Sequence, residues 1–90
     1  IDLTIEQEQK NLIKERAKKE WPEDYEMQVH FISKQQNALK ALKNHNPTEI
    51  SSDKFKNIRK NAKKEWPNDY EMQLHFENKQ IQKLIELNEM

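Results

Sequence analysis

The sequence of 90 residues contains no glycine and no cysteine. Without glycine, Gly-rich phosphate loops and tight hairpins that need a positive φ are not expected, which excludes Rossmann, P-loop and all-β folds. Without cysteine the chain has no disulfides, thiolate metal sites or cysteine nucleophiles, and it carries no information about redox compartment. A chain of this length forms one small domain at most.

The sequence also has no excess of positive or negative charge and no long apolar run. Sixteen Lys and Arg balance sixteen Asp and Glu, so the net charge is zero although 36% of the residues are charged. Nucleic-acid binding draws mainly on a basic excess and is therefore not favoured. No apolar run approaches the roughly 20 residues of a membrane span, and no signal-like segment is present. We expect no membrane association and favour a cytoplasmic location, and because the sequence starts at Ile1 rather than Met we allow for an upstream segment.

What the chain does contain is an internal repeat of 45 residues. Residues 17–31 (AKKEWPEDYEMQVHF) align with residues 62–76 (AKKEWPNDYEMQLHF), and thirteen of the fifteen positions are identical. A fixed period over matching segments indicates tandem duplication. We expect a single helical domain over residues 1–90, with repeat units 1–45 and 46–90 and a linker at about 44–51.

Each unit has the pattern of a short helix, a Trp-Pro corner and a longer helix. Apolar residues at helical spacing predict four helices. The first spans residues 5–20, and the second runs from the first corner to about residue 43. The third runs from the linker to about residue 65, and the fourth from about residue 67 to 88. In the first unit, either Pro22 opens the second helix or Asp24 is its N-cap. Thr4 and Gln7 fit a capping box for the first helix.

The linker separates the two units at Asn44, His45, Asn46 and Pro47, where Asn is a usual helix terminator and Pro follows it. His45 is predicted to face solvent. The competing N-caps of the third helix are Thr48, Ser51 and Ser52.

Both long helices carry apolar residues on two sides. One stripe of the second helix contains Tyr25, Val29, Ile32, Gln36 and Leu39, and the matching stripe of the fourth contains Tyr70, Leu74, Ile81 and Ile85. The opposite sides form a candidate interaction face of Met27, Phe31, Met72 and Phe76. These two sides are expected to meet across an internal pseudo-twofold axis in a four-helix bundle, or to face another copy or another protein.

The corners and the charges give two further sets of candidates. Trp21 and Trp66 are predicted to pack over Tyr25 and Tyr70 and so fix the corners, or else to act as aromatic platforms. The repeated basic patch consists of Lys18, Lys19, Lys63 and Lys64. Because these lysines end the short helices, they complement the helix dipole, which accounts for their placement without a ligand.

No catalytic group, metal or cofactor is expected. The pairs Glu26–His30 and Glu71–His75 share a helix face, but this spacing is a weak metal signal. The sequence therefore predicts a small, non-enzymatic, all-α module for protein–protein interaction or assembly, whose partner is another protein or a second copy of the chain. The alternative is a nucleic-acid-associated regulator that uses the lysine pairs and the Trp corners.

Overall fold

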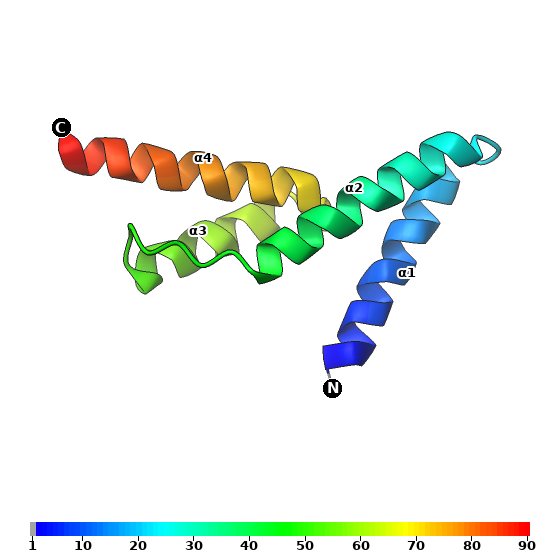
Figure 1. Cartoon of the computed structure of the whole chain (residues 1–90), viewed down its shortest axis with the longest axis horizontal. Coiled ribbons are helices and arrows are strands. Elements are labelled where there is room, and N and C mark those ends of the chain that lie inside the picture. The colour runs from blue at the N-terminus through cyan, green and yellow to red at the C-terminus, as the bar shows by residue number, and fades with distance from the viewer. Residues whose placement is uncertain (1) are drawn as a thin grey trace. The chain divides into compact units, whose positions relative to one another are not determined.

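The computed structural model describes the backbone of residues 2–90 and the side chains of residues 7–90. This part of the chain contains four helices and no strand: α1 (Asp2–Glu20), α2 (Tyr25–Lys43), α3 (Ser52–Glu65) and α4 (Tyr70–Glu89), as Figure 1 shows. The all-α prediction is thereby confirmed. None of the described helices is both long enough and apolar enough to cross a bilayer.

Side-chain caps explain where three of the helices begin. Asp24 accepts a hydrogen bond from the Met27 N–H (3.1 Å), and Asp69 accepts the equivalent bond from the Met72 N–H (3.3 Å). Ser51 accepts from the N–H of residue 54 at 3.3 Å. An acceptor that satisfies an N–H of the first turn favours a helix start at the next residue. Asp24 and Ser51 are therefore the caps among the predicted alternatives.

Two helix starts differ from the expected ones. α4 begins at Tyr70, three residues after Pro67, because Asp69 and not the proline is its N-cap. α1 begins at Asp2 instead of residue 5, so Thr4 lies inside the helix. Its capping bond involves a side chain outside the described residues.

The chain divides into two compact units, Ile1–Asn37 and Ala38–Met90. The boundary lies within α2, earlier than the sequence repeat places it. The last residues of α2 therefore belong to the same unit as α3 and α4.

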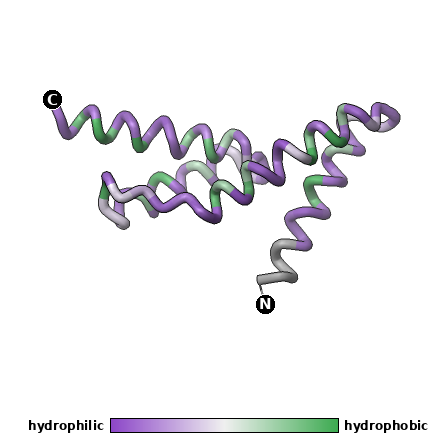
Figure 2. The backbone as a smooth tube through the Cα atoms, in the orientation of Figure 1, coloured by the Kyte–Doolittle hydropathy of each residue, from purple (hydrophilic) through white to green (hydrophobic). Residues whose placement is uncertain are grey.

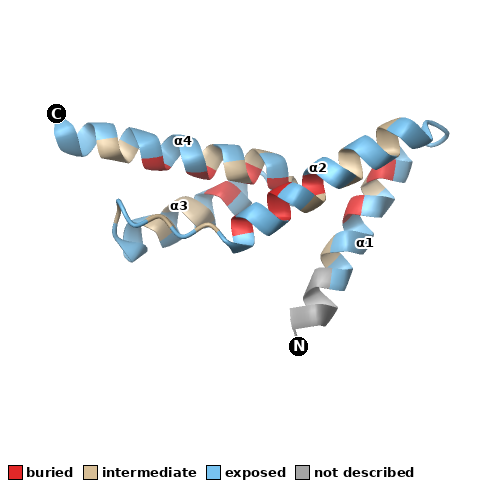
Figure 3. Cartoon of the chain, in the orientation of Figure 1, coloured by how far each residue is buried: buried red, intermediate tan, exposed pale blue. Residues whose placement is uncertain are grey.

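In the first unit, α1 and the beginning of α2 diverge from the corner that joins them (Figure 1). Ile13 and Ala17 of α1 and Gln35 of α2 are buried, as the red segments of Figure 3 show. The half-buried Phe31 ring lies with its centroid 5.4 Å from that of Trp21. The Arg16 guanidinium lies 5.8 Å from the centroid of the same ring, in cation–π range.

In the second unit, α3 and α4 run side by side (Figure 1). Hydrophilic residues outnumber hydrophobic ones along both helices, as Figure 2 shows, so the interior is thin. The buried residues of α3 and α4 are Ala62, Tyr70, Gln73, Glu77 and Ile81, and the end of α2 contributes Ala38, Leu39 and Leu42.

The predicted apolar stripe of α2 is wrong in its first half. Tyr25 is 70% exposed and Val29 is 64% exposed, although both were expected to be covered. In α4 the predicted Tyr70 and Ile81 are buried, but they share that line with two polar residues, Gln73 and Glu77. A helix buries the face that a neighbouring element contacts, and apolar spacing alone does not identify that face.

Candidate functional site

The short helices end with the same backbone bond at the two Trp-Pro corners. In the first, the Trp21 N–H donates to the Ala17 carbonyl at 2.9 Å, and in the second the Trp66 N–H donates to the Ala62 carbonyl at 2.9 Å. Both alanines are completely buried. The short helix therefore continues its hydrogen bonding up to the tryptophan, and the proline that follows, which has no N–H, ends it.

A glutamine side chain closes each corner. The Gln28 Nε2 donates to the Trp21 carbonyl at 2.6 Å, and the Gln73 Nε2 donates to the Trp66 carbonyl at 2.8 Å. These bonds satisfy carbonyls that the helix ends would leave unpaired. Sequence reasoning missed both glutamines, although their identical spacing from the two tryptophans was a usable signal.

The second corner contains a turn with a left-handed residue. Asn68 has φ 67°, and the Asp69 N–H donates to the Trp66 carbonyl at 3.3 Å. Proline followed by a residue of positive φ is the pattern of a type II turn, and Asn tolerates that conformation better than most residues. The equivalent residue of the first corner is Glu23, and Asn68 is the only residue in the described part of the chain with positive φ.

The aromatic residues of the two corners lie in different surroundings. The ring beside Trp21 is that of Phe31, and Tyr25 is 70% exposed. The prediction that Trp21 packs over Tyr25 is therefore wrong, because successive turns of the long helix bring Phe31, and not Tyr25, to Trp21. In the second corner Tyr70 is buried and Trp66 is 38% exposed, and the pairing of these two rings stays a prediction.

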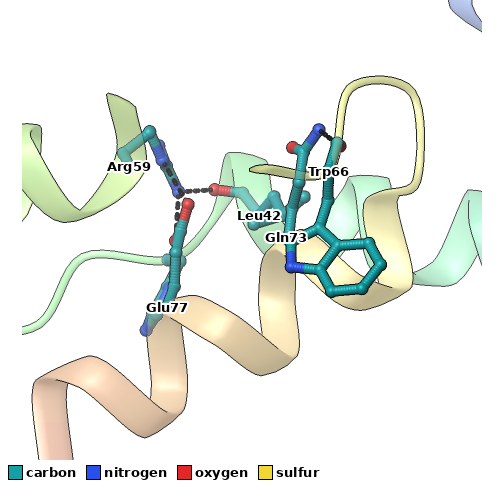
Figure 4. Close-up of polar contacts among 6 residues, drawn as sticks. Leu42, Arg59, Trp66, Gln73 and Glu77 are labelled. Carbon is teal, nitrogen blue, oxygen red and sulfur yellow. Dashed lines mark hydrogen bonds and ion pairs between the residues drawn. The ribbon is translucent and has the colours of Figure 1, made fainter. Parts of the chain in front are cut away.

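A buried ion pair lies in the second unit (Figure 4). The Glu77 side chain is 1% exposed and accepts from the Arg59 Nε at 3.0 Å and from its Nη2 at 3.1 Å. The same Nη2 donates to the Leu42 carbonyl at 2.6 Å. The guanidinium thereby links α3, α4 and the last turn of α2. A buried carboxylate requires such pairing, because its desolvation is otherwise very costly.

His45 completes this cluster. Its Nδ1 lies 2.9 Å from the Glu77 Oε1, and its side chain is largely buried. The Phe55 ring contacts the His45 ring edge-on at 5.3 Å and the Arg59 guanidinium at 4.7 Å. The prediction that His45 faces solvent is therefore wrong, because the linker returns along α4 and brings the imidazole to Glu77.

Two open grooves flank α4 in this unit. One, of about 380 Å³, is lined by the linker residues His45 and Pro47 and by Ile81 and Ile85 of α4. The other, of about 360 Å³, lies between α3 and α4. We call it the α3–α4 groove; its apolar residues are Ile58, Leu84 and Leu87, and its two charged residues are Lys54 and Lys83.

The predicted interaction face and basic patch occupy different surroundings. All four residues of the face, Met27, Phe31, Met72 and Phe76, are half-buried. The four lysines of the patch, Lys18, Lys19, Lys63 and Lys64, are exposed in the last turns of α1 and α3. Their position at the carboxyl ends of helices is the favourable one for cations.

The two predicted Glu–His pairs are also at the surface. His30 and His75 are exposed, as are Glu26 and Glu71. Among the described residues, no group of three or more His, Asp or Glu side chains is arranged to hold a metal ion.

The fold and its polar contacts define an all-helical protein of two compact units. Comparison with protein-family models, with curated proteins and with solved structures gives no match to this chain. Any assignment of function consequently rests on its own residues.

Proposed function

We propose that the chain is a small, non-enzymatic helical module for protein–protein interaction or assembly. The observation that carries this proposal is the α3–α4 groove, where the fold leaves apolar side chains open. Leu87, at its edge, is 64% exposed. Contiguous apolar surface on a small domain marks an interaction site more often than single exposed residues do.

The buried polar side chains of the second unit support a structural role, although a buried Glu beside a His would otherwise suggest acid–base catalysis. Glu77 is bonded to Arg59 and His45, and Gln73 to a corner carbonyl. A general acid or base must reach a substrate proton, and a carboxylate enclosed in this way is already engaged by its partners. We therefore assign these residues to holding the groove helices together.

The half-buried face extends the proposal to the four-helix bundle. We propose that the Met27 and Phe31 side meets the Met72 and Phe76 side across a pseudo-twofold axis that relates the two repeats. Met side chains adapt to irregular apolar surroundings, which also suits contact with another protein. Met27→Asp and Phe31→Asp, followed by circular dichroism and sedimentation, separate the two roles: loss of helicity indicates a bundle core, whereas a folded chain that no longer associates indicates an interface.

The interaction function is tested by capturing binding partners on the immobilised protein. Wild type, Leu87→Glu and Val29→Glu are compared as baits in an extract of the source cells, and proteins and nucleic acids are both identified. Val29 is the matched control, because it is as exposed as Leu87 (64%) but lies on the other unit. We expect wild type and Val29→Glu to retain the same proteins and Leu87→Glu to lose them.

The opposite result is equally recognisable. If the bait retains nucleic acid and no protein, and releases it steeply as salt rises, the lysine pairs are the functional surface and the proposal is wrong. Retention of no protein by any bait also contradicts it.

A further inference from the structure

The α3–α4 groove has an uneven charge. Lys54 of α3 and Lys83 of α4 lie on its wall, and no described carboxylate lines it, although the whole chain is neutral. The remaining polar lining consists of the neutral amides Asn57, Asn61 and Gln80. The lining of the groove thus combines three apolar side chains with two lysines.

The lysines are available to a ligand. Lys54 is exposed, and Lys83 makes an ion pair with Glu86 at 3.1 Å in which the two side chains are 61% and 55% exposed. Exposed pairs of this kind contribute little free energy and exchange partners readily. A carboxylate that approaches the groove can therefore replace Glu86 beside Lys83.

We propose that this groove binds an amphipathic helix of a partner protein whose apolar stripe is bordered by Asp or Glu side chains. The inference rests on the proposed interaction function and names the chemistry of its partner. Ile58, Leu84 and Leu87 receive apolar side chains of the bound helix, as in other helix-in-groove complexes. Lys54 and Lys83 face its carboxylates, and this charge complementarity selects acidic helices over basic ones.

The direct test uses two synthetic helical peptides as probes. Both carry the same leucine stripe over about 18 residues, a length of roughly 27 Å, and they differ only in having Glu or Lys beside the stripe. Binding of the labelled peptides to the full chain is measured by fluorescence anisotropy. We expect the Glu peptide to bind at least about tenfold more tightly than the Lys peptide, and Leu87→Glu to weaken it by at least about tenfold.

Reversing the charge of the two lysines provides a more discriminating test. The double variant Lys54→Glu/Lys83→Glu should exchange the preference, so that the Lys peptide binds more tightly than the Glu peptide. Val29→Glu should leave both affinities unchanged. Because all of these positions are exposed, circular dichroism should report the same helicity for every variant.

Several outcomes overturn the inference. They are equal affinity for both peptides, no binding of either, an unchanged preference in the charge-reversed variant, and self-association of the chain through Leu87. If any of these occurs while the wild-type bait still captures protein and Leu87→Glu does not, the inference of an acidic helical partner is wrong and the proposed function stands. If the bait captures no protein, the proposed function fails as well.

Discussion

The two repeats are nearly identical around their corners, yet they differ where the interior forms. Position 32 in the first repeat is Ile, and the equivalent position 77 in the second is a buried Glu. Lys14 of the first repeat corresponds to Arg59, which holds that carboxylate. The repeated block therefore yields the same helix ends, glutamine bonds and Asp caps in both units, whereas a few side chains outside the block decide how each long helix is anchored.

The tyrosines show the same contrast within the identical block itself. Tyr25 and Tyr70 each begin a long helix after the same Trp-Pro-x-Asp sequence, but Tyr25 is exposed and Tyr70 is buried. Their burial depends on the surroundings in each unit and not on their neighbours in the sequence. Substitutions made in matched pairs, one in each repeat, test this difference.

The largest effect is expected for Arg59→Met. This change leaves Glu77 buried without its main partner, which costs about 3 kcal/mol or more of the free energy of unfolding. The matched change Lys14→Met in the first repeat should have little effect, because Lys14 is exposed. Urea unfolding followed by Trp66 fluorescence in a Trp21→Phe background measures Arg59→Met, and Trp21 fluorescence in a Trp66→Phe background measures Lys14→Met, because the two tryptophans lie in different units. Equal losses for the two variants would show that the repeats are anchored alike.

Removal of the tyrosine rings should separate the repeats almost as clearly. Tyr70→Ala deletes a buried aromatic ring and is expected to cost about 3 kcal/mol. Tyr25→Ala removes a ring that is largely in solvent and should change the midpoint of urea unfolding only slightly. A large loss for Tyr25→Ala would mean that this ring is covered in solution.

The helix caps, by contrast, should behave identically in the two repeats. Asp24→Ala and Asp69→Ala each remove a side-chain acceptor from a first-turn N–H, which costs about 1 kcal/mol. Asn at either position should restore most of the loss, because it accepts the same bond. The comparison is made by thermal unfolding, and a cost at one corner alone contradicts the equivalence of the corners.

The smallest combined cost of a matched pair of substitutions is expected at the residue after each proline. Asn68→Glu places a residue with low left-handed preference at φ 67° and should cost about 1 kcal/mol. Glu23→Asn, which makes the first corner resemble the second, should have almost no effect. Chemical denaturation of the two variants provides the readout, and stabilisation by Glu23→Asn would place the same left-handed turn in both corners.

Much of the local structure was predictable from the sequence. Proline, the Asp and Ser caps and the apolar spacing located four helices and both corners, because each acts within a few residues. The starts of α1 and α4 were predicted less accurately. At the start of α4, Pro67 and Asp69 both suit a helix start, and only the turn at Asn68 decides between them.

The anchoring of the second unit could not be predicted in the same way. Glu77 reads as a solvent-facing residue, because charged residues are rarely buried unless they are paired. Its partners lie 18 residues away in α3 and 32 residues away in the linker, so the pairing is tertiary. Similarly, the α3–α4 groove depends on which faces α3 and α4 turn toward each other.

The central claim is that the Arg59–Glu77 pair anchors the second repeat in a way that the first lacks. A double-mutant cycle with Arg59→Met, Glu77→Ile and the double variant, measured by urea unfolding, tests it most directly. We predict that the double variant loses about 2 kcal/mol less free energy of unfolding than the two single variants lose together, because removing both charges leaves neither one unpaired. Losses that add to within about 0.5 kcal/mol would contradict the claim.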